Sequence, residues 1–313
     1  MVVDVASFGE ILWDIFETGE GVYRRELGGA PANLAVVLAR LGIKSRVVGG
    51  VGADSFGRGL LALLKREKVD VSKVVVLPNR TGLTFVSRDK AGEPSFLFYR
   101  HETADMSIDD GNLPDAAGKA TFAVVGTSTL MTDGLWDATT AFAAQARKAK
   151  GAFVVDLNVR AHLWPSVTRM RTEIADLVRH AHVVKASASD LAALAPEDGL
   201  DFLARHAPKA VWVITRGGDH ATISGAIESF DVRTKKVRVV DATGAGDAFL
   251  GGVLATLVRS KANPGTAQWK NRAVWERAAE NGHAVAAQAV RGLGGTSGVK
   301  NLAAIVRRLQ VKA

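Results

Sequence analysis

Short β-rich segments alternate with amphipathic helical segments along most of the chain, and this alternation limits the possible folds more than any other feature. Residues 2–8 are rich in β-branched side chains. The apolar residues of 34–41 then recur at the spacing of one helix face. Because buried strands that alternate with helices form parallel sheets covered on both faces, the sequence predicts a doubly wound, mostly parallel α/β fold.

The same rhythm continues to the end of the 313 residues. Strands are expected at 2–8, 45–49, 121–125, 152–157, 183–185, 211–215 and 238–240. Helices are expected at 31–41, 60–65, 135–148, 246–258, 269–290 and 302–309, and after Pro165. The chain contains no internal repeat, and its length allows one large α/β domain or two ordinary ones.

Two stretches depart from the rhythm. Residues 21–27 form a short run between glycines in which polar side chains alternate with others. The β-rich runs 81–86 and 96–100 are joined by the turn-forming residues 89–92. We expect these stretches to form a small antiparallel sheet, built from about 15–28 and 81–103, that covers the main layer as a lid.

Composition excludes several classes of protein. The chain has no cysteine, which excludes disulfides, cysteine zinc sites, iron–sulfur clusters and a cysteine nucleophile. No apolar run reaches the ~20 residues of a membrane span. Three acidic residues interrupt the N-terminal stretch, so no signal-peptide core is expected there. We therefore expect a cytoplasmic protein that does not bind membranes.

The net charge of +8 suits an anionic ligand. The basic residues are scattered, however, and aromatic residues make up only 6% of the chain. Because nucleic-acid readers combine a basic patch with a recognisable motif, we expect a phosphate-bearing small molecule and no nucleic acid as the partner.

The strongest local signal is Asp-Ala-Thr-Gly-Ala-Gly-Asp at 241–247, between an expected strand and an expected helix. Small residues at a helix N-terminus let backbone amides converge on an anion. A carboxylate beside such a site repels the anion unless it has a task. Asp247 is therefore either a general base for a hydroxyl that attacks phosphorus or an ordinary first-turn helix acid.

A second signal is Gly28-Gly29-Ala-Pro-Ala-Asn33, which opens the first helix. The glycines allow close approach of a ligand to the backbone. Asn33 either hydrogen-bonds sugar hydroxyls or only caps the helix. Asp14 follows the first strand, where ligands of parallel sheets bind, although a solvated loop position explains it equally.

Several nucleotide-binding and catalytic motifs are absent from the sequence. It has no Walker P-loop, no protein-kinase motif set, no HExxH, no dinucleotide fingerprint and no GxSxG elbow. The seven histidines show no tight metal-ligand spacing.

Together the two motifs resemble the signatures of the ribokinase-like, or PfkB-type, carbohydrate kinases over nearly the full chain. The N-terminal one continues through Leu41-Gly42 and the segment 51–57, and the C-terminal one extends to Phe249. The resemblance implies a single kinase domain spanning 1–313, with a doubly wound core and a β lid. It also implies transfer of the γ-phosphoryl group of ATP to a sugar or nucleoside hydroxyl, with Mg²⁺.

The resemblance also implies roles for individual residues. Asp247 would be the catalytic base, and the backbone amides of Gly244, Ala245 and Gly246 would form an anion hole. The substrate would contact Asp14, Gly28, Gly29, Asn33, Arg100 and Arg160. The nucleotide would contact Ser187, Thr215, Gly217, Gly218, Thr243 and Asn281, although Asn281 is equally readable as a polar helix residue.

Bacterial fructokinases are the most similar subgroup, on the segments 9–14, 98–100 and 156–165. We therefore expect a fructokinase, with a 2-keto-3-deoxygluconate kinase or another sugar or nucleoside kinase of the family as the alternative. A regulator that binds sugar or nucleotide without turnover is the alternative of a different class. Lid strands with apolar residues would permit a homodimer.

The segment 185–190 departs from the Asn-x-x-Glu pattern of the family. Ser187 replaces the asparagine and Asp190 replaces the glutamate. Asp190 is expected to assist Mg²⁺ binding, with a shorter reach, or else Ser187 and Asp190 only cap the next helix. Asp241 and Thr243 match positions that hold a monovalent cation such as K⁺ in some members.

Overall fold

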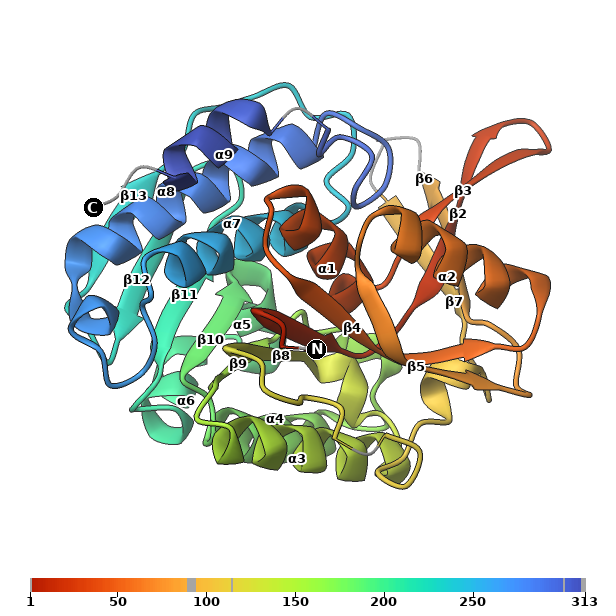
Figure 1. The fold of residues 1–313 in the computed structure, drawn as a ribbon, viewed down its shortest axis with the longest axis horizontal. Coiled ribbons are helices and arrows are strands. Elements are labelled where there is room, and N and C mark those ends of the chain that lie inside the picture. Colours follow the sequence, from red (N-terminus) through yellow and green to blue (C-terminus); the bar gives the residue numbers. More distant parts are fainter. Residues whose placement is uncertain (1, 89–93, 114, 301, 311–313) are drawn as a thin grey trace.

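The structure is a computed structural model that describes residues 2–88, 94–113, 115–300 and 302–310. Within these residues, nine strands form one sheet and four strands form a second, smaller sheet. Figure 1 shows the large sheet between two layers of helices, with the smaller sheet at one end of it. The expected α/β architecture with an attached small sheet is confirmed.

The large sheet has the order β13-β12-β11-β10-β9-β8-β1-β4-β5. All neighbours from β11 to β5 are parallel, whereas β12 and β13 are antiparallel additions at one edge. Every residue of β1, β4 and β9 is buried, because helices cover both faces. The strands are β1 (Val5–Phe8), β4 (Ser45–Gly52), β5 (Asp70–Leu77), β8 (Phe122–Gly126), β9 (Ala152–Asp156), β10 (Val183–Ser187), β11 (Val211–Thr215), β12 (His220–Gly225) and β13 (Phe230–Arg233).

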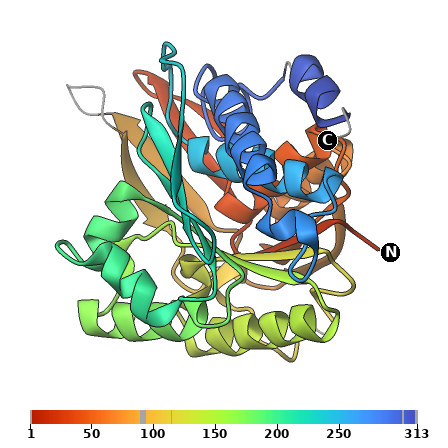
Figure 2. The ribbon, with the colours of Figure 1, turned by 90° about the vertical axis from the view of Figure 1, so that its left-hand side faces the viewer.

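Two hydrophobic cores lie on opposite faces of this sheet, and a third lies beside the small sheet. The first packs under α3 (Asp133–Lys148), α4 (Val167–Val178), α5 (Ala188–Leu194) and α6 (Gly199–His206). The second packs under α1 (Ala30–Arg40), α7 (Ala245–Arg259), α8 (Arg272–Ala289) and α9 (Ala303–Gln310). The third includes α2 (Ser55–Arg66). Figures 1 and 2 show the two helix layers on either side of the strands.

The small sheet has the order β3-β2-β6-β7. Its two hairpins are antiparallel and join through a parallel β2–β6 pair. It starts at Leu12, earlier than the predicted residue 15, and the predicted turn at 89–92 lies outside the described residues. The strands are β2 (Leu12–Gly19), β3 (Val22–Gly28), β6 (Leu83–Arg88) and β7 (Pro94–Tyr99).

The predicted strand at 238–240 is wrong. These residues form no ladder, and Val239 and Val240 are 56% and 51% exposed. The backbone amide of Val240 instead donates to the carbonyl of Val290, 2.7 Å away, so the segment is tied to the end of α8. The prediction failed because β-branched residues indicate a strand only where a neighbouring strand is available to pair.

Among the strands and α-helices of the described residues, β5, β12, β13 and α6 were not predicted. Most of them are short or half-exposed, so that their apolar residues do not form a contiguous run. No helix in the described part of the chain combines the length and the apolar character that a membrane span requires.

Candidate active site

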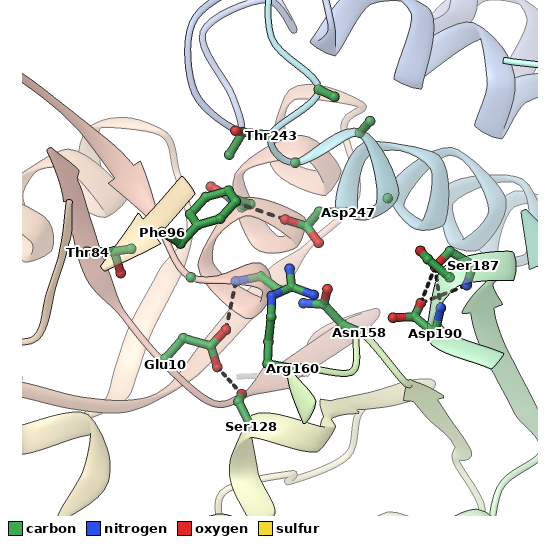
Figure 3. A pocket seen from close by; sticks show the side chains of 18 of the residues that line it. Glu10, Thr84, Phe96, Ser128, Asn158, Arg160, Ser187, Asp190, Thr243 and Asp247 are labelled. Atoms are coloured by element: carbon green, nitrogen blue, oxygen red, sulfur yellow. Dashed lines mark hydrogen bonds between the residues drawn. The ribbon is translucent and has the colours of Figure 1, made fainter. Parts of the chain in front are cut away.

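A cavity of about 660 Å³ lies between the small sheet and the carboxyl ends of the large-sheet strands. Its walls include Thr84, Phe96 and Phe98 from the small sheet, Thr215 at the end of β11, and the start of α7. This is the position at which open parallel sheets bind ligands. Figure 3 shows the labelled side chains converging on the cavity from both sheets.

Asp247 lies in the first turn of α7 and faces this cavity. Its side chain is buried, and Asn33 Nδ2 on α1 donates to Asp247 Oδ2 over 3.0 Å. Burial, and then the charge of Asp156, raise the pKa of Asp247 to about 7. The hydrogen bond from Asn33 and the charge of Lys185 act in the opposite direction. Asp247 is therefore a carboxyl group that changes charge near neutral pH.

The segment 244–246 forms the turn into α7. Gly244 is the N-cap residue with a φ of +72°, and a Cβ there would lie 2.4 Å from the Cα of Gly295. Only glycine fits this position, because a side chain would be both strained and in collision. The amides of the first helical residues have no partner within the helix, which suits an anion, although the Ala245 amide donates to the carbonyl of Ala242 over 3.1 Å.

Asp14 lies within β2, opposite Glu26 and Thr84, and not on a loop after the first strand. It is buried and lines the cavity together with Glu10. Burial, followed by the negative charges of Asp247, Glu10 and Asp241, raises the pKa of Asp14 well above its ordinary value. The structure therefore gathers several carboxyl groups in one poorly solvated space.

The two glycines before α1 permit this crowding. A Cβ on Gly28 would lie 2.5 Å from the Asp14 carboxyl group, so Gly28 makes room for Asp14 but does not itself line the cavity. Gly29 does line it, with a φ of +92°, and a Cβ there would lie 2.2 Å from the carbonyl oxygen of Glu10. Gly28 and Gly29 thus bring the backbone and an acidic side chain to the cavity wall.

Arg100 and Arg160 both line the cavity, but their charges differ in environment. Arg100 is buried, and its Nε donates to Asp105 Oδ2 over 2.7 Å. Burial alone would lower the pKa of Arg100, but Asp105 and Glu10 raise it overall. Arg160 donates from Nη1 to the carbonyl of Val159 and extends into the cavity (Figure 3). The Arg100 charge is therefore balanced locally.

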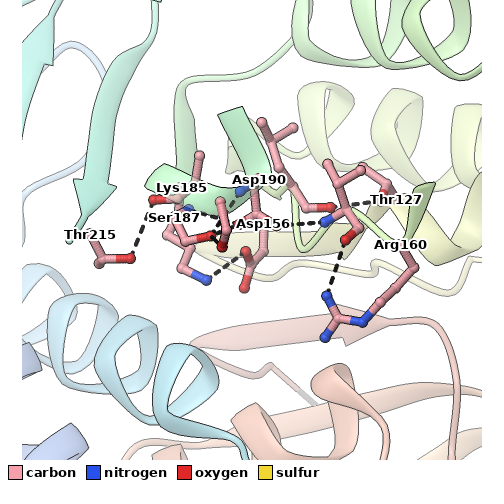
Figure 4. Close-up of polar contacts among 11 residues, drawn as sticks. Thr127, Asp156, Arg160, Lys185, Ser187, Asp190 and Thr215 are labelled. Carbon is pink, nitrogen blue, oxygen red and sulfur yellow. Dashed lines mark hydrogen bonds and ion pairs between the residues drawn. The ribbon is translucent and has the colours of Figure 1, made fainter. Parts of the chain in front are cut away.

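Ser187 and Asp190 form a capping box at the start of α5. Ser187 Oγ accepts from the Asp190 amide, Asp190 Oδ2 accepts from the Ser187 amide, and Asp190 Oδ1 accepts from the Val159 amide over 2.8 Å. This arrangement is the helix-capping alternative that the sequence left open. Both residues line the cavity, with the Asp190 carboxylate already holding the loop after β9 (Figure 4).

Asp241 and Thr243 organise the loop that precedes α7. Asp241 is buried, and its Oδ1 accepts from both the amide and the hydroxyl of Thr243, while its Oδ2 accepts from the Gly294 amide over 2.8 Å. Within the described ranges, no group of three or more acidic or histidine side chains is placed to hold a metal ion.

A second cavity, of about 610 Å³, adjoins the first along Thr215, Gly217, Ala245 and Gly246. Gly218 lines the second cavity only. The α8 residues that line it, at positions 283, 286 and 287, fall on one face of the helix together with the C-cap residue Val290.

Asn281, which the resemblance places at the nucleotide, lies on the side of α8 that faces α7. Asn281 lies two residues before His283, and therefore on nearly the opposite side of α8. Its Nδ2 donates to Thr256 Oγ1 on α7 over 3.0 Å, and it lines neither cavity.

Sequence reasoning missed several residues that the fold brings to the cavity. Glu10 Oε1 accepts from the Ala30 amide and its Oε2 accepts from Ser128 Oγ. Lys185 Nζ lies 2.9 Å from Asp156 Oδ1, with both side chains buried. A lysine inside a β-rich segment, as at 185, is the one signal that could have been followed, because an isolated charge in a buried strand needs a partner.

The arrangement can support phosphoryl transfer to a hydroxyl group. A carboxyl group with a pKa near neutrality faces a cavity beside a helix N-terminus, and a second cavity opens on the other side of that terminus. The carboxyl group can accept a proton, and the helix N-terminus between the two cavities can bind an anion that develops charge.

Comparison with known proteins agrees with this chemistry. Residues 4–302 match the model of the pfkB family carbohydrate kinases. The chain is 34% identical over 267 residues to the Arabidopsis thaliana protein named probable fructokinase-6, chloroplastic, which covers 81% of this chain and 70% of that protein. It is 35% identical over 277 residues to fructokinase-1 of Zea mays, which covers 82% of this chain and 83% of that protein.

Solved structures are similar over nearly the whole chain. The Xylella fastidiosa fructokinase with bound ATP superimposes with a TM-score of 0.86 at 27% identity, covering 98% of both chains. The Vibrio cholerae fructokinase with fructose, ADP and calcium ion also has a TM-score of 0.86, at 29% identity, covering 98% of this chain and 99% of that one. The chain therefore belongs to the pfkB family of carbohydrate kinases.

Proposed function

We propose that the protein is a fructokinase, which transfers the γ-phosphoryl group of ATP to a hydroxyl group of D-fructose. The observation that carries this proposal is Asp247. Its carboxyl group is buried, has a pKa of about 7 and lies at the N-terminus of α7, where the two cavities meet. A base with a pKa near the working pH suits removal of a hydroxyl proton. The similar fructokinases named above support fructose as the acceptor.

In the proposed reaction, ionised Asp247 accepts the proton of the sugar hydroxyl as its oxygen attacks the γ-phosphorus. The bond between that phosphorus and the β,γ-bridging oxygen breaks, and ADP leaves with the electron pair. The amides of Gly244, Ala245 and Gly246 donate to the oxygens of the transferring group, for which the Ala245 amide must give up its hydrogen bond to the Ala242 carbonyl. Such preorganised donors stabilise the charge that develops in the transition state.

The sugar occupies the first cavity, where Asp14, Gly29, Asn33, Arg100 and Arg160 surround it and Gly28 supports Asp14. The charges here favour a neutral sugar over a sugar acid. Two carboxyl groups, those of Glu10 and Asp14, line this side, and Asp105 already balances the charge of Arg100. A substrate carboxylate on this side would therefore face Glu10 and would gain little from Arg100. This observation favours fructose over 2-keto-3-deoxygluconate.

The nucleotide occupies the second cavity, with its phosphates directed toward Asp247. Thr215, Gly217 and Gly218 lie on the strand-end loop that lines it, and Thr243 and Ser187 face the first cavity at the phosphate end. Asn281 has no part in this proposal, because it is directed at α7.

Mg²⁺ enters this proposal as a partner of the nucleotide phosphates. The described residues do not form a protein cage for it, and both Asp190 oxygens already accept hydrogen bonds, so Asp190 would reach the metal through water. For K⁺, Asp241 and Thr243 form the candidate loop, and their mutual hydrogen bonds hold it in shape. The Vibrio cholerae fructokinase is described with calcium in one structure and potassium in another.

We also propose one kinase domain with the small sheet as its lid, and a homodimer formed through the outer face of that lid. This outer face consists of Tyr23, Phe85, Leu97 and Tyr99. Leu97 and Tyr99 are 58% and 56% exposed, and the rings of Tyr23 and Tyr99 each form a T-shaped contact with Phe85. An exposed apolar patch of this kind is typical of an interface. Sedimentation of the wild type and of Leu97→Asp tests this, because a dimer should dissociate in the variant.

The proposed location is the cytoplasm, supported by the absence of cysteine. One similar plant protein is named chloroplastic, so cell fractionation with antibody detection is the relevant test.

A coupled assay for ADP release tests the function directly. Fructose, 2-keto-3-deoxygluconate, ribose, tagatose and adenosine are offered with ATP and Mg²⁺, in KCl and in NaCl. We expect turnover with fructose, and a loss of ~10²-fold or more in kcat for Asp247→Asn, with ATP binding retained. Turnover with a different acceptor would reassign the substrate. Binding of ATP and sugar without turnover on any acceptor would favour a non-catalytic regulator.

A further inference from the structure

The buried ion pair between Lys185 and Asp156 has no part in the proposed reaction. The two residues face each other across neighbouring strands, because Lys185 on β10 is in register with Asp156 at the end of β9. Lys185 Nζ lies 2.9 Å from Asp156 Oδ1, and the two side chains are 5% and 7% exposed (Figure 4). A buried ion pair is costly to desolvate, so stability alone is a weak reason for one at the wall of a cavity.

The Lys185 ammonium group lies directly against the first turn of α7. A Cβ on Gly246 would be 2.8 Å from Lys185 Nζ, so the absent side chain of Gly246 provides the space that the ammonium group occupies. The N-terminus of a helix is itself positive, and a cation beside it is unfavourable unless negative charge is near. The location of Lys185 therefore requires an explanation from the carboxyl groups around it.

Those carboxyl groups come from every element that packs around Asp247. The charged and titratable side chains that line the cavities beside Asp247 are Glu10 after β1, Asp14 on β2, Arg100 after β7, Asp156 on β9, Arg160 after β9, Lys185 on β10, Asp190 on α5 and Arg216 after β11. Asp105, the partner of Arg100, and Asp241 before α7 lie close to them. Acidic groups outnumber basic ones among all of these residues. An incoming nucleotide phosphate adds further negative charge, which would oppose ionisation of Asp247.

Lys185 and Asp156 act on Asp247 in opposite directions. After burial, the charge of Asp156 is the next cause that raises the pKa of Asp247, whereas the charge of Lys185 lowers it. Burial alone would lower the pKa of Lys185, but Asp156, then Asp190, raise it overall, so Lys185 carries its charge at neutral pH. Burial is also the main cause that raises the pKa of Asp156, with Lys185 opposing it.

We propose that Lys185 is a positioning residue of this site, whose buried ammonium group, anchored by Asp156 beneath the first turn of α7, sets the charge state of Asp247. The inference rests on the proposed function in one respect, namely that Asp247 is the base. Lys185 acts through Asp247 and the shape of the 244–246 turn. The Lys185–Asp156 pair works as a unit, since each partner offsets the effect of the other.

The test compares Lys185→Met, Asp156→Asn and the double variant, with the exposed Lys209→Met as the matched control. The pH dependence of kcat/KM for fructose gives the apparent pKa of the base. We expect an upward shift of about one unit in Lys185→Met, a downward shift in Asp156→Asn and a near-wild-type value in the double variant. Lys209→Met should leave the profile unchanged. A purely structural role would lower activity without shifts of opposite sign.

A second readout does not depend on turnover. The free energy of unfolding is measured against pH for the wild type, Lys185→Met and Asp156→Asn, each with and without Asp247→Asn. The pH dependence of the difference within each pair reports the pKa of Asp247 in that protein. Shifts in the same direction, or no shift, in Lys185→Met and Asp156→Asn would overturn the inference. Retained turnover in Asp247→Asn would instead refute the base role, while this second readout still decides the inference.

If Lys185→Met fails to fold, Lys185→Gln takes its place. The amide can still donate to Asp156 but carries no charge. The same upward shift is expected, and an unchanged value in Lys185→Gln would overturn the inference.

Discussion

Replacing Asp247 by asparagine should stabilise the protein above neutral pH while it lowers kcat. Asp247 is buried, and its pKa is raised from an ordinary 3.8 to about 7. The folded state therefore keeps a proton that the unfolded chain releases at lower pH. Between these two values the unfolded state binds fewer protons, so the stability of the wild type falls as pH rises.

The magnitude follows from the two pKa values. One pKa unit corresponds to ~1.4 kcal/mol, so the full difference amounts to about 4 kcal/mol above pH 7. Neighbouring carboxyl groups such as Asp14 titrate together with Asp247, so removing Asp247 also changes their protonation. The expected gain in the free energy of unfolding is therefore about 1–4 kcal/mol. The new amide oxygen can still accept the hydrogen bond from Asn33, so the Asn33 donor keeps its partner.

The assay is urea unfolding followed by tryptophan fluorescence, at pH 4 and at pH 8. Asp247→Asn and the wild type should differ little at pH 4, and the variant should be more stable at pH 8. Asp137→Asn makes the same chemical change at an exposed position of α3 and should show no such pH dependence. The reasoning is refuted if Asp247→Asn gains equally at both pH values, or loses stability at pH 8.

Three further variants test individual features of the site. Gly29→Ala places a Cβ 2.2 Å from the Glu10 carbonyl oxygen at a positive φ. Urea unfolding should show that the free energy of unfolding falls by ~2 kcal/mol or more, and steady-state kinetics should show a raised KM for fructose. A wild-type KM would contradict the close packing. Asp105→Asn leaves Arg100 buried without its counter-charge, so thermal unfolding should reveal a loss of ~3 kcal/mol; a change under 1 kcal/mol would argue against the pair. Asn281→Ala should lower stability by ~1 kcal/mol and leave the KM for ATP unchanged, whereas a raised KM would restore Asn281 to the nucleotide site.

Local sequence was sufficient for the main elements of the large sheet. The helix at 31–41 was predicted from its apolar spacing and is observed as α1, and 211–215 was predicted and observed as β11. These predictions succeed because a buried helix face and a strand buried on both sides leave a periodic signature in the residues themselves. The glycines of the two motifs also had a local cause, since Gly29 and Gly244 adopt positive φ values.

The partners of these residues were beyond the reach of local patterns. Nothing near Lys185 in the sequence indicates that Asp156 faces it, because the contact depends on the register of two strands joined by a helix. Local sequence was equally unable to predict that Asn281 faces α7, since this depends on where α7 packs against α8. The strand predicted at 238–240 failed for the same reason, as its neighbour in space is the end of α8.

The sequence by itself determined the alternating α/β architecture, the glycine turns and the acid at 247, because each of these leaves a signature within a few residues. The tertiary structure alone decided the electrostatics of the site. Asp14, Asp156, Lys185 and Asp247 come from four separate elements, and the pKa of Asp247 depends on burial and on charges far away in the chain. Both effects act through space, so they exist only once the fold has excluded water from the cavity wall.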